Sequence, residues 1–157
     1  MFDTVNGLPV HPLVVHAVVV LLPLAVLGTI ALAVRPAWRR PYGPLLSLVA
    51  ALAVVLCPVA TSSGEQLEKH VGDPGQHAEL GDQLVWFAIP VLVLAVVMTY
   101  LARRPARRGS GPSWLPAAVS VLAVVAAVAC GVQVFRVGDS GARAAWGDKV
   151  SQSAGHQ

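Results

Sequence analysis

The sequence has few charged residues. Asp, Glu, Lys and Arg make up only 12% of its 157 residues, whereas hydrophobic residues make up 55%. A soluble domain carries about 25% charged residues. The hydrophobic residues also gather in long runs that no water-soluble core of this size could bury. We therefore expect an integral membrane protein whose main partner is the lipid bilayer.

Cysteine is scarce as well. Cys57 and Cys130 each lie inside an apolar run, which excludes a disulfide framework and a Cys-x-x-Cys metal site. Buried free cysteine usually serves as a small hydrophobic residue. A redox pair is the alternative, since both residues fall at similar depths in the predicted membrane.

Two further classes of feature are missing. The formal charge is +3, but no basic face carries base-stacking residues, so we expect no nucleic-acid partner. Residues 1–10 contain no Lys or Arg, so the first apolar run lacks the basic start of a secretory signal. We expect that run to be retained as a membrane span.

Four runs reach the length of about 20 apolar residues that a membrane-spanning helix needs. They cover residues 12–34, 42–62, 80–102 and 114–135. The pattern predicts an all-α fold, a four-transmembrane-helix bundle within residues 1–150, and a disordered tail at 151–157. Asp139 or Ser140 is expected to cap a separate short interfacial helix. No internal repeat is evident.

The basic residues predict the orientation of the bundle. Seven of the eleven lie in the two connections that follow the first and third spans: Arg35, Arg39, Arg40, Arg103, Arg104, Arg107 and Arg108. Short connections rich in Lys and Arg stay cytoplasmic. The other side then carries the four remaining basic residues and all eight acids, a charge of 4 − 8 = −4. We expect a multi-pass protein of the cell membrane with both termini extracytoplasmic.

Candidate site residues gather on the predicted outer side. His11, His16, His70 and His77 all map there, whereas His156 lies in the predicted tail. His16 would lie about 6 Å below the outer surface at 1.5 Å rise per residue, and an ionisable residue at that depth is a candidate functional residue. Imidazole is the commonest side-chain ligand for metals and also ligates haem iron.

We predict His16 and His77 as the ligands of a haem or a transition metal, with His11 in reserve. Glu65 and Glu79 complete the predicted metal site, as partners that would orient the rings. Gly81 follows His77 by one turn, which leaves room for a flat ligand or a close backbone. The alternative is a structural role, because interfacial histidines often only bond a nearby carbonyl, and no strict metal motif is present.

Other chemistry lacks the necessary residues. No carboxylate, lysine or arginine lies in the middle of a span. The spans therefore lack the charged side chains that a proton relay or a voltage sensor needs. No histidine lies on the predicted inner side, which argues against two stacked haems across the bilayer. Any site is expected to be single and outward-facing.

The sequence also resembles a known family. The stretch from Asn6 to His16, the stretch from His77 to Asp82, and Gly138 to Ala142 with Trp146 are similar to the domain of unknown function 2231 family. The resemblance covers nearly the whole chain and implies a four-helix membrane protein. Relatives fused to cytochrome c or Rieske-type modules imply redox work near the membrane surface, by analogy. Some relatives have histidine where this chain has Asp139.

Three functions follow from these observations. The first is an accessory membrane protein that binds haem or a transition metal and works with a membrane redox protein. The second is a scaffold or assembly factor that holds a partner and binds no cofactor. The third is a quinone-linked redox enzyme.

Overall fold

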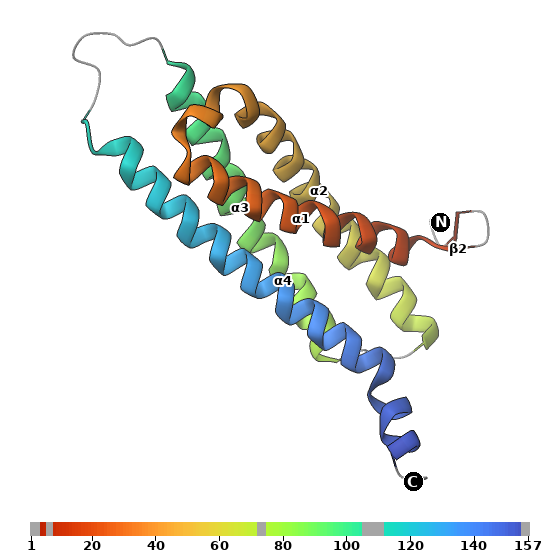
Figure 1. Ribbon diagram of the computed structural model, residues 1–157. Coiled ribbons are helices and arrows are strands. Elements are labelled where there is room, and N and C mark those ends of the chain that lie inside the picture. The colour runs from red at the N-terminus through yellow and green to blue at the C-terminus, as the bar shows by residue number, and fades with distance from the viewer. Residues whose placement is uncertain (1–3, 6–7, 72–74, 105–111, 155–157) are drawn as a thin grey trace.

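Four long helices make up most of the molecule. A computed structural model describes residues 4–5, 8–71, 75–104 and 112–154, and the side chains at 11–66, 75–104 and 112–143. The helices are α1 (Val10–Val34), α2 (Arg39–Val71), α3 (Gln76–Arg103) and α4 (Leu115–Ala154) (Figure 1). These confirm the predicted all-helical four-helix bundle.

Short elements complete the described chain. A 3-10 turn, η1 (Pro36–Trp38), joins α1 to α2. Two strands of two residues, β1 (Thr4–Val5) and β2 (Leu8–Pro9), pair antiparallel in front of α1. The sequence did not predict this hairpin.

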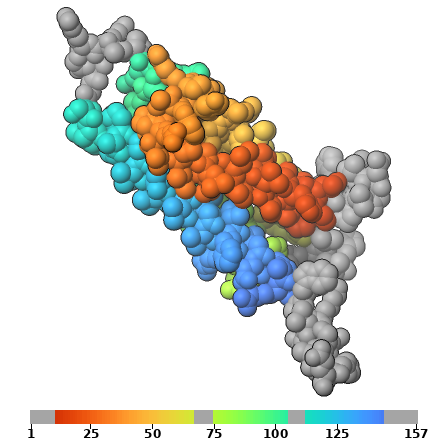
Figure 2. All heavy atoms as spheres, viewed as in Figure 1, coloured from red at the N-terminus to blue at the C-terminus, as the bar shows by residue number. Residues whose placement is uncertain are grey.

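The helices form an up-and-down bundle. Helix α1 packs against α2 and α4, α3 also packs against α2 and α4, and α1 lies diagonally across from α3. The starts of α1 and α3 lie at one end of the bundle, together with the ends of α2 and α4 (Figure 1). Figure 2 shows α1 and α4 side by side along one face. The helix ends that carry the candidate histidines therefore all lie at the same end of the bundle.

The packing pattern suits a lipid environment. Alanines with no exposed surface occupy the helix contacts: Ala25, Ala53, Ala95, Ala123 and Ala127. Large apolar side chains such as Leu27, Val121 and Phe135 face outward. Membrane helices associate through small residues that let the backbones approach. All four helices are long and apolar enough to cross a membrane.

All four helices are longer than the predicted spans, and α2 and α4, with 33 and 40 residues, exceed them most. Helix α4 runs without a break through Asp139 and Ser140 to Ala154, so these residues do not begin a separate helix as predicted. The sequence has no proline from 117 to 154, and its Ala, Arg and Gln residues sustain a helix. The helix thereby enters the segment expected to be a disordered tail, and residues 155–157 lie outside the described part.

The bundle contains an internal repeat of two helical hairpins, α1–α2 and α3–α4. A shift of 66 positions, which places position 11 on position 77, matches six buried residues of α1 with six buried residues of α3. A shift of 77 positions matches three of α2 with three of α4. The pairs are Val18/Leu84, Leu22/Ala88, Ala25/Val91, Thr29/Ala95, Leu32/Met98, Ala33/Thr99, Leu46/Ala123, Ala50/Ala127 and Ala53/Cys130.

This finding corrects the expectation that no repeat is present. Only the pair Ala50/Ala127 keeps the same residue, so burial is conserved between the hairpins while identity mostly is not. Because α1 and α3 run in the same direction, the repeats are related by an axis along the bundle, as in membrane proteins with parallel repeats.

Arg39 joins three helices at the end away from the histidines. Its side chain is 6% exposed. Nε donates to the Leu32 carbonyl at 2.8 Å, and Nη2 donates to the Ala33 carbonyl at 3.0 Å and to Ser120 Oγ at 2.7 Å. Carbonyls in the last turn of a helix have no intrahelical partner. Arg39 thus caps α1 and ties it to α4, a structural role beyond its predicted role in orientation.

We expect Arg39→Ala to destabilise the bundle by about 1–3 kcal/mol, because it leaves buried carbonyls without a donor. Arg40→Ala is the matched control, since Arg40 is the neighbouring arginine and is exposed. Thermal unfolding in detergent, followed by circular dichroism, compares the two. Equal unfolding temperatures for both variants would contradict the capping role.

Candidate functional site

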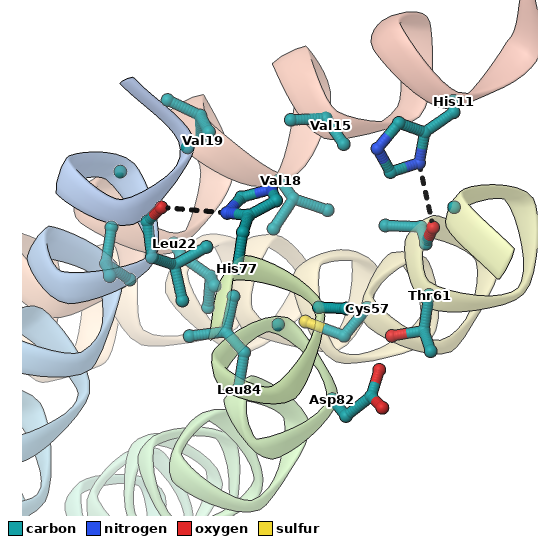
Figure 3. A pocket seen from close by; sticks show the side chains of 18 of the residues that line it. His11, Val15, Val18, Val19, Leu22, Cys57, Thr61, His77, Asp82 and Leu84 are labelled. Atoms are coloured by element: carbon teal, nitrogen blue, oxygen red, sulfur yellow. Dashed lines mark hydrogen bonds between the residues drawn. The ribbon is translucent and has the colours of Figure 1, made fainter. Parts of the chain in front are cut away.

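A cavity of about 640 Å³ lies at the histidine end of the bundle. All four helices line it (Figure 3), and its volume falls in the usual range for small-molecule sites. Most of the lining is apolar, for example Val15, Val18, Leu22 and Leu84. The polar part includes two histidines and two acids: His11, His77, Glu65 and Asp82.

His77, in the first turn of α3, contacts α4. Its Nδ1 lies 3.1 Å from the Val137 carbonyl oxygen and 3.2 Å from Ser140 Oγ. The Ser140 hydroxyl donates to the same carbonyl at 2.9 Å. The imidazole is therefore held by a carbonyl and a hydroxyl one helical turn apart on the neighbouring helix.

His11, at the start of α1, contacts α2 in the same way. Its Nδ1 lies 3.0 Å from the Ala60 carbonyl oxygen and 3.2 Å from Ser63 Oγ, and the Ser63 hydroxyl donates to that carbonyl at 2.9 Å. Ala60 and Ser63 are the repeat equivalents of Val137 and Ser140. We call each set of histidine, carbonyl and serine a histidine station.

The stations determine which ring nitrogen carries the proton. A carbonyl oxygen has no proton to donate, so the Nδ1 that faces it must be the donor. In the neutral imidazole, Nε2 is then the unprotonated nitrogen and is able to accept a hydrogen bond or bind a metal. Among the described residues, Nε2 of His11 and of His77 has no hydrogen-bond partner. Two free basic nitrogens thus belong to the lining of one cavity.

A glycine completes each station. A Cβ atom at Gly64 would lie 3.1 Å from His11 Cε1, and one at Gly141 would lie 2.9 Å from His77 Cε1. Real Cβ contacts of that length are rare or absent. Glycine at both positions lets the ring lie flat against the neighbouring helix.

His16 lies apart from this arrangement. Its imidazole is exposed, and its Nδ1 bonds the Pro12 carbonyl of its own helix. His16 does not line the cavity, whereas His77 and the reserve residue His11 do. The structure therefore brings together His11 and His77, and places His16 elsewhere.

The predicted acidic partners also separate. Glu65 lines the cavity, but Glu79 does not. Among the residues whose side chains are described, no three of His, Cys, Asp and Glu are grouped so that they could hold a metal ion. The side chains of His70 and His156 lie outside the described residues. The predicted metal set of His16, His77, Glu65 and Glu79 is therefore not gathered at one place.

Cys57 contributes a thiol to the cavity wall, while Cys130 is buried outside the lining. Both are free thiols. A buried polar contact lies just below His77, where Gln133 Nε2 donates to the Leu80 carbonyl at 3.0 Å and ties α4 to α3. The repeat equivalent of Gln133 is Leu56, so this second tie exists on one side alone.

The comparison with known proteins agrees with this architecture. A family model described as "Predicted membrane protein (DUF2231)" matches residues 7–154. The chain belongs to this family. The match confirms the predicted resemblance, and it spans both histidine stations of this DUF2231 protein. No curated protein and no solved structure matches the chain.

Sequence reasoning missed the serines and glycines of the stations. Ser63-Gly64 and Ser140-Gly141 are the same dipeptide in equivalent positions of α2 and α4. The two dipeptides can be seen in the sequence. The shift of 77 positions that makes them equivalent became evident only from the buried residues of α2 and α4. Ser140 was instead expected to be a helix cap.

We expect Gly141→Ala to displace the His77 ring from the Val137 carbonyl, because the added Cβ would overlap Cε1. Nitrogen-15 NMR of labelled histidine checks this. In the unmodified protein Nδ1 of His77 carries the proton, and the variant loses that signature.

Gly131→Ala is the matched control for this variant, because its Cβ would meet Val26 at an ordinary 3.5 Å. The His77 spectrum should not change in this control. An unchanged His77 spectrum in Gly141→Ala would refute the proposed constraint.

Proposed function

We propose that this membrane protein binds haem in the cavity, with Nε2 of His11 and Nε2 of His77 as the two iron ligands. The observation that carries the proposal is the pair of histidine stations. Each commits Nδ1 to a carbonyl of a neighbouring helix, which leaves Nε2 without a partner among the described residues, on a side chain that lines the cavity. Histidines that ligate metals usually donate their other ring N–H in this manner.

The shape and lining of the cavity support the same ligand. Haem is flat and mostly apolar, and the apolar side chains of Val15, Val18 and Leu84 line the cavity near the histidines (Figure 3). His11 and His77 come from helices that lie diagonally across the bundle, so they approach the cavity from two sides. Bound haem would supply one-electron redox chemistry, tuned by its axial ligands and burial.

The charges at the cavity suggest one orientation for the ligand. Glu65 of α2 and Asp82 of α3 are exposed and line the cavity. Their repeat equivalents, Ala142 of α4 and His16 of α1, carry no acid. Like charges repel, so the propionates of a haem would leave the cavity along the α1–α4 side.

We expect the purified protein to bind added hemin with the spectrum of a six-coordinate, bis-imidazole iron. His11→Ala and His77→Ala should each weaken binding by more than about tenfold, because even loss of a group behind a ligand costs 10–100-fold. A titration followed by the Soret band measures the affinity.

His16→Ala is the matched control for the titration. It removes an imidazole of the same helix that lies outside the cavity, and it should bind hemin as the unmodified protein does. Loss of binding in His16→Ala with retention in His11→Ala would overturn the ligand assignment. A metal assay on the protein as purified separates haem iron from a directly bound transition metal.

A scaffold is the second candidate, and the stations also favour it. Each imidazole joins two helices through Nδ1, which stabilises the bundle whether or not a ligand is present. In that case the protein would bind no hemin, and the two histidine variants would lower the unfolding temperature alone.

We also propose that the cavity faces away from the cytoplasm. Arg35, Arg40, Arg103 and Arg104 lie at the opposite end of the bundle from the histidines, and such a basic end stays inside. At that end, Arg35 lies over Trp38 at 5.0 Å, and Arg104 lies over Tyr100 at 4.4 Å. Aromatic residues of this kind mark a membrane interface.

Fusions at the C-terminus test the orientation. Alkaline phosphatase, which needs the periplasm or cell exterior, should be active there, and green fluorescent protein should be dark. The opposite pair of results would place the cavity in the cytoplasm.

A further inference from the structure

The two halves of the cavity differ in the size of their side chains. On the first hairpin, Val15 of α1 and Thr61 of α2 line the cavity. Their repeat equivalents on the second hairpin are Gly81 of α3 and Gly138 of α4, which also line it. The cavity therefore extends toward α3 and α4, where two side chains are missing.

Packing does not account for these two glycines. A Cβ atom at Gly81 or at Gly138 would meet nothing within 4 Å. By contrast, a Cβ atom at Gly28 would lie 2.8 Å from Leu46 Cδ1, so that glycine permits a close helix contact. Glycine is the poorest residue for a helix interior after proline, so the fold gains nothing from it at 81 and 138.

Both glycines lie next to the second histidine station. Gly81 follows His77 by four residues, about one turn along the same face of α3. Gly138 precedes Gly141, the glycine beneath the His77 ring, by three residues. The open surface thus continues from His77 along both α3 and α4, where a flat ring could lie against two backbones.

We infer that Gly81 and Gly138 form the seat of a flat macrocycle of the tetrapyrrole class, which lies against the α3–α4 hairpin and beside His77. This inference rests on the proposed function and deepens it. The opposite wall, with Val15 and Thr61, is filled and contacts the other face of the ring. Glycine at 81 and 138 thus makes room for the ligand.

Substitutions that copy the first hairpin onto the second test the seat. Gly81→Val and Gly138→Thr introduce the residues of positions 15 and 61 where an added Cβ atom would meet nothing within 4 Å. Gly81→Ala and Gly138→Ala are milder versions, and Gly131→Ala, outside the cavity lining, is the control. Thermal unfolding should show every variant folded, with unchanged or higher stability.

Two probes separate the seat from iron ligation. Hemin reports ligation through its Soret band, and metal-free protoporphyrin IX reports the seat through its fluorescence. We expect Gly81→Val and Gly138→Thr to weaken both probes at least tenfold, while Gly131→Ala leaves both unchanged. His11→Ala and His77→Ala should weaken hemin far more than protoporphyrin.

The results distinguish failure of the glycine seat from failure of the proposed iron ligation. If hemin is ligated and the valine and threonine variants bind it normally, the seat is refuted and the proposed function stands. If hemin shows no bis-imidazole spectrum but protoporphyrin binds and is lost in those variants, the seat stands and iron ligation is refuted. If neither macrocycle binds the unmodified protein, both are overturned.

Discussion

The site depends on one hydrogen bond, repeated twice: an imidazole Nδ1 donates to a backbone carbonyl of the neighbouring helix. The carbonyl can only accept, so the bond fixes the tautomer as well as the direction of the ring. The serine one turn away accepts from the same N–H and donates to the same carbonyl, and the glycine removes the atom that would push the ring aside. The iron ligation proposed for the cavity follows from the Nε2 atoms that this arrangement leaves free.

The bilayer explains why such an arrangement lies at the end of the bundle. In the hydrocarbon region each helix satisfies its own backbone, and contacts are made by alanine and other small residues. Polar side chains that tie one helix to another are placed near the ends, with Arg39 at one end and the histidine stations at the other. The repeat supplies two equivalent stations. Where the two hairpins differ in sequence, the two sides of the cavity differ in size and charge. Gly81 and Gly138 open one wall, and Glu65 and Asp82 place charge on one side.

The sequence was sufficient to predict whatever depends on local composition. The four apolar runs predicted the four helices, and the motifs at both ends of the chain predicted the family. The sequence also pointed to His77 and Gly81, and both residues line the cavity. The stations could not be predicted, because they require the register of α1 against α2 and of α3 against α4, and no local spacing encodes that register. The structural role of Arg39 could not be predicted for the same reason. The neighbouring arginines indicated only the orientation of the bundle in the membrane, whereas the hydrogen-bond partners of Arg39 lie on α1 and α4.

The choice between His11 and His16 shows how more could have been drawn from the chain. An α-helix turns about 100° per residue, so residues seven apart lie about 20° from the same face, and residues two apart lie about 200° apart. Val18 points into the core with 5% of its surface exposed. His11 precedes it by seven residues and His16 by two, so His11 shares the core face and His16 points away from it. His77 stands in the same relation to the buried Leu84. Once the core face of each helix is known, its continuation toward the end of the bundle identifies His11 and His77 as the histidines that line the cavity. The argument from depth in the membrane pointed to His16 instead.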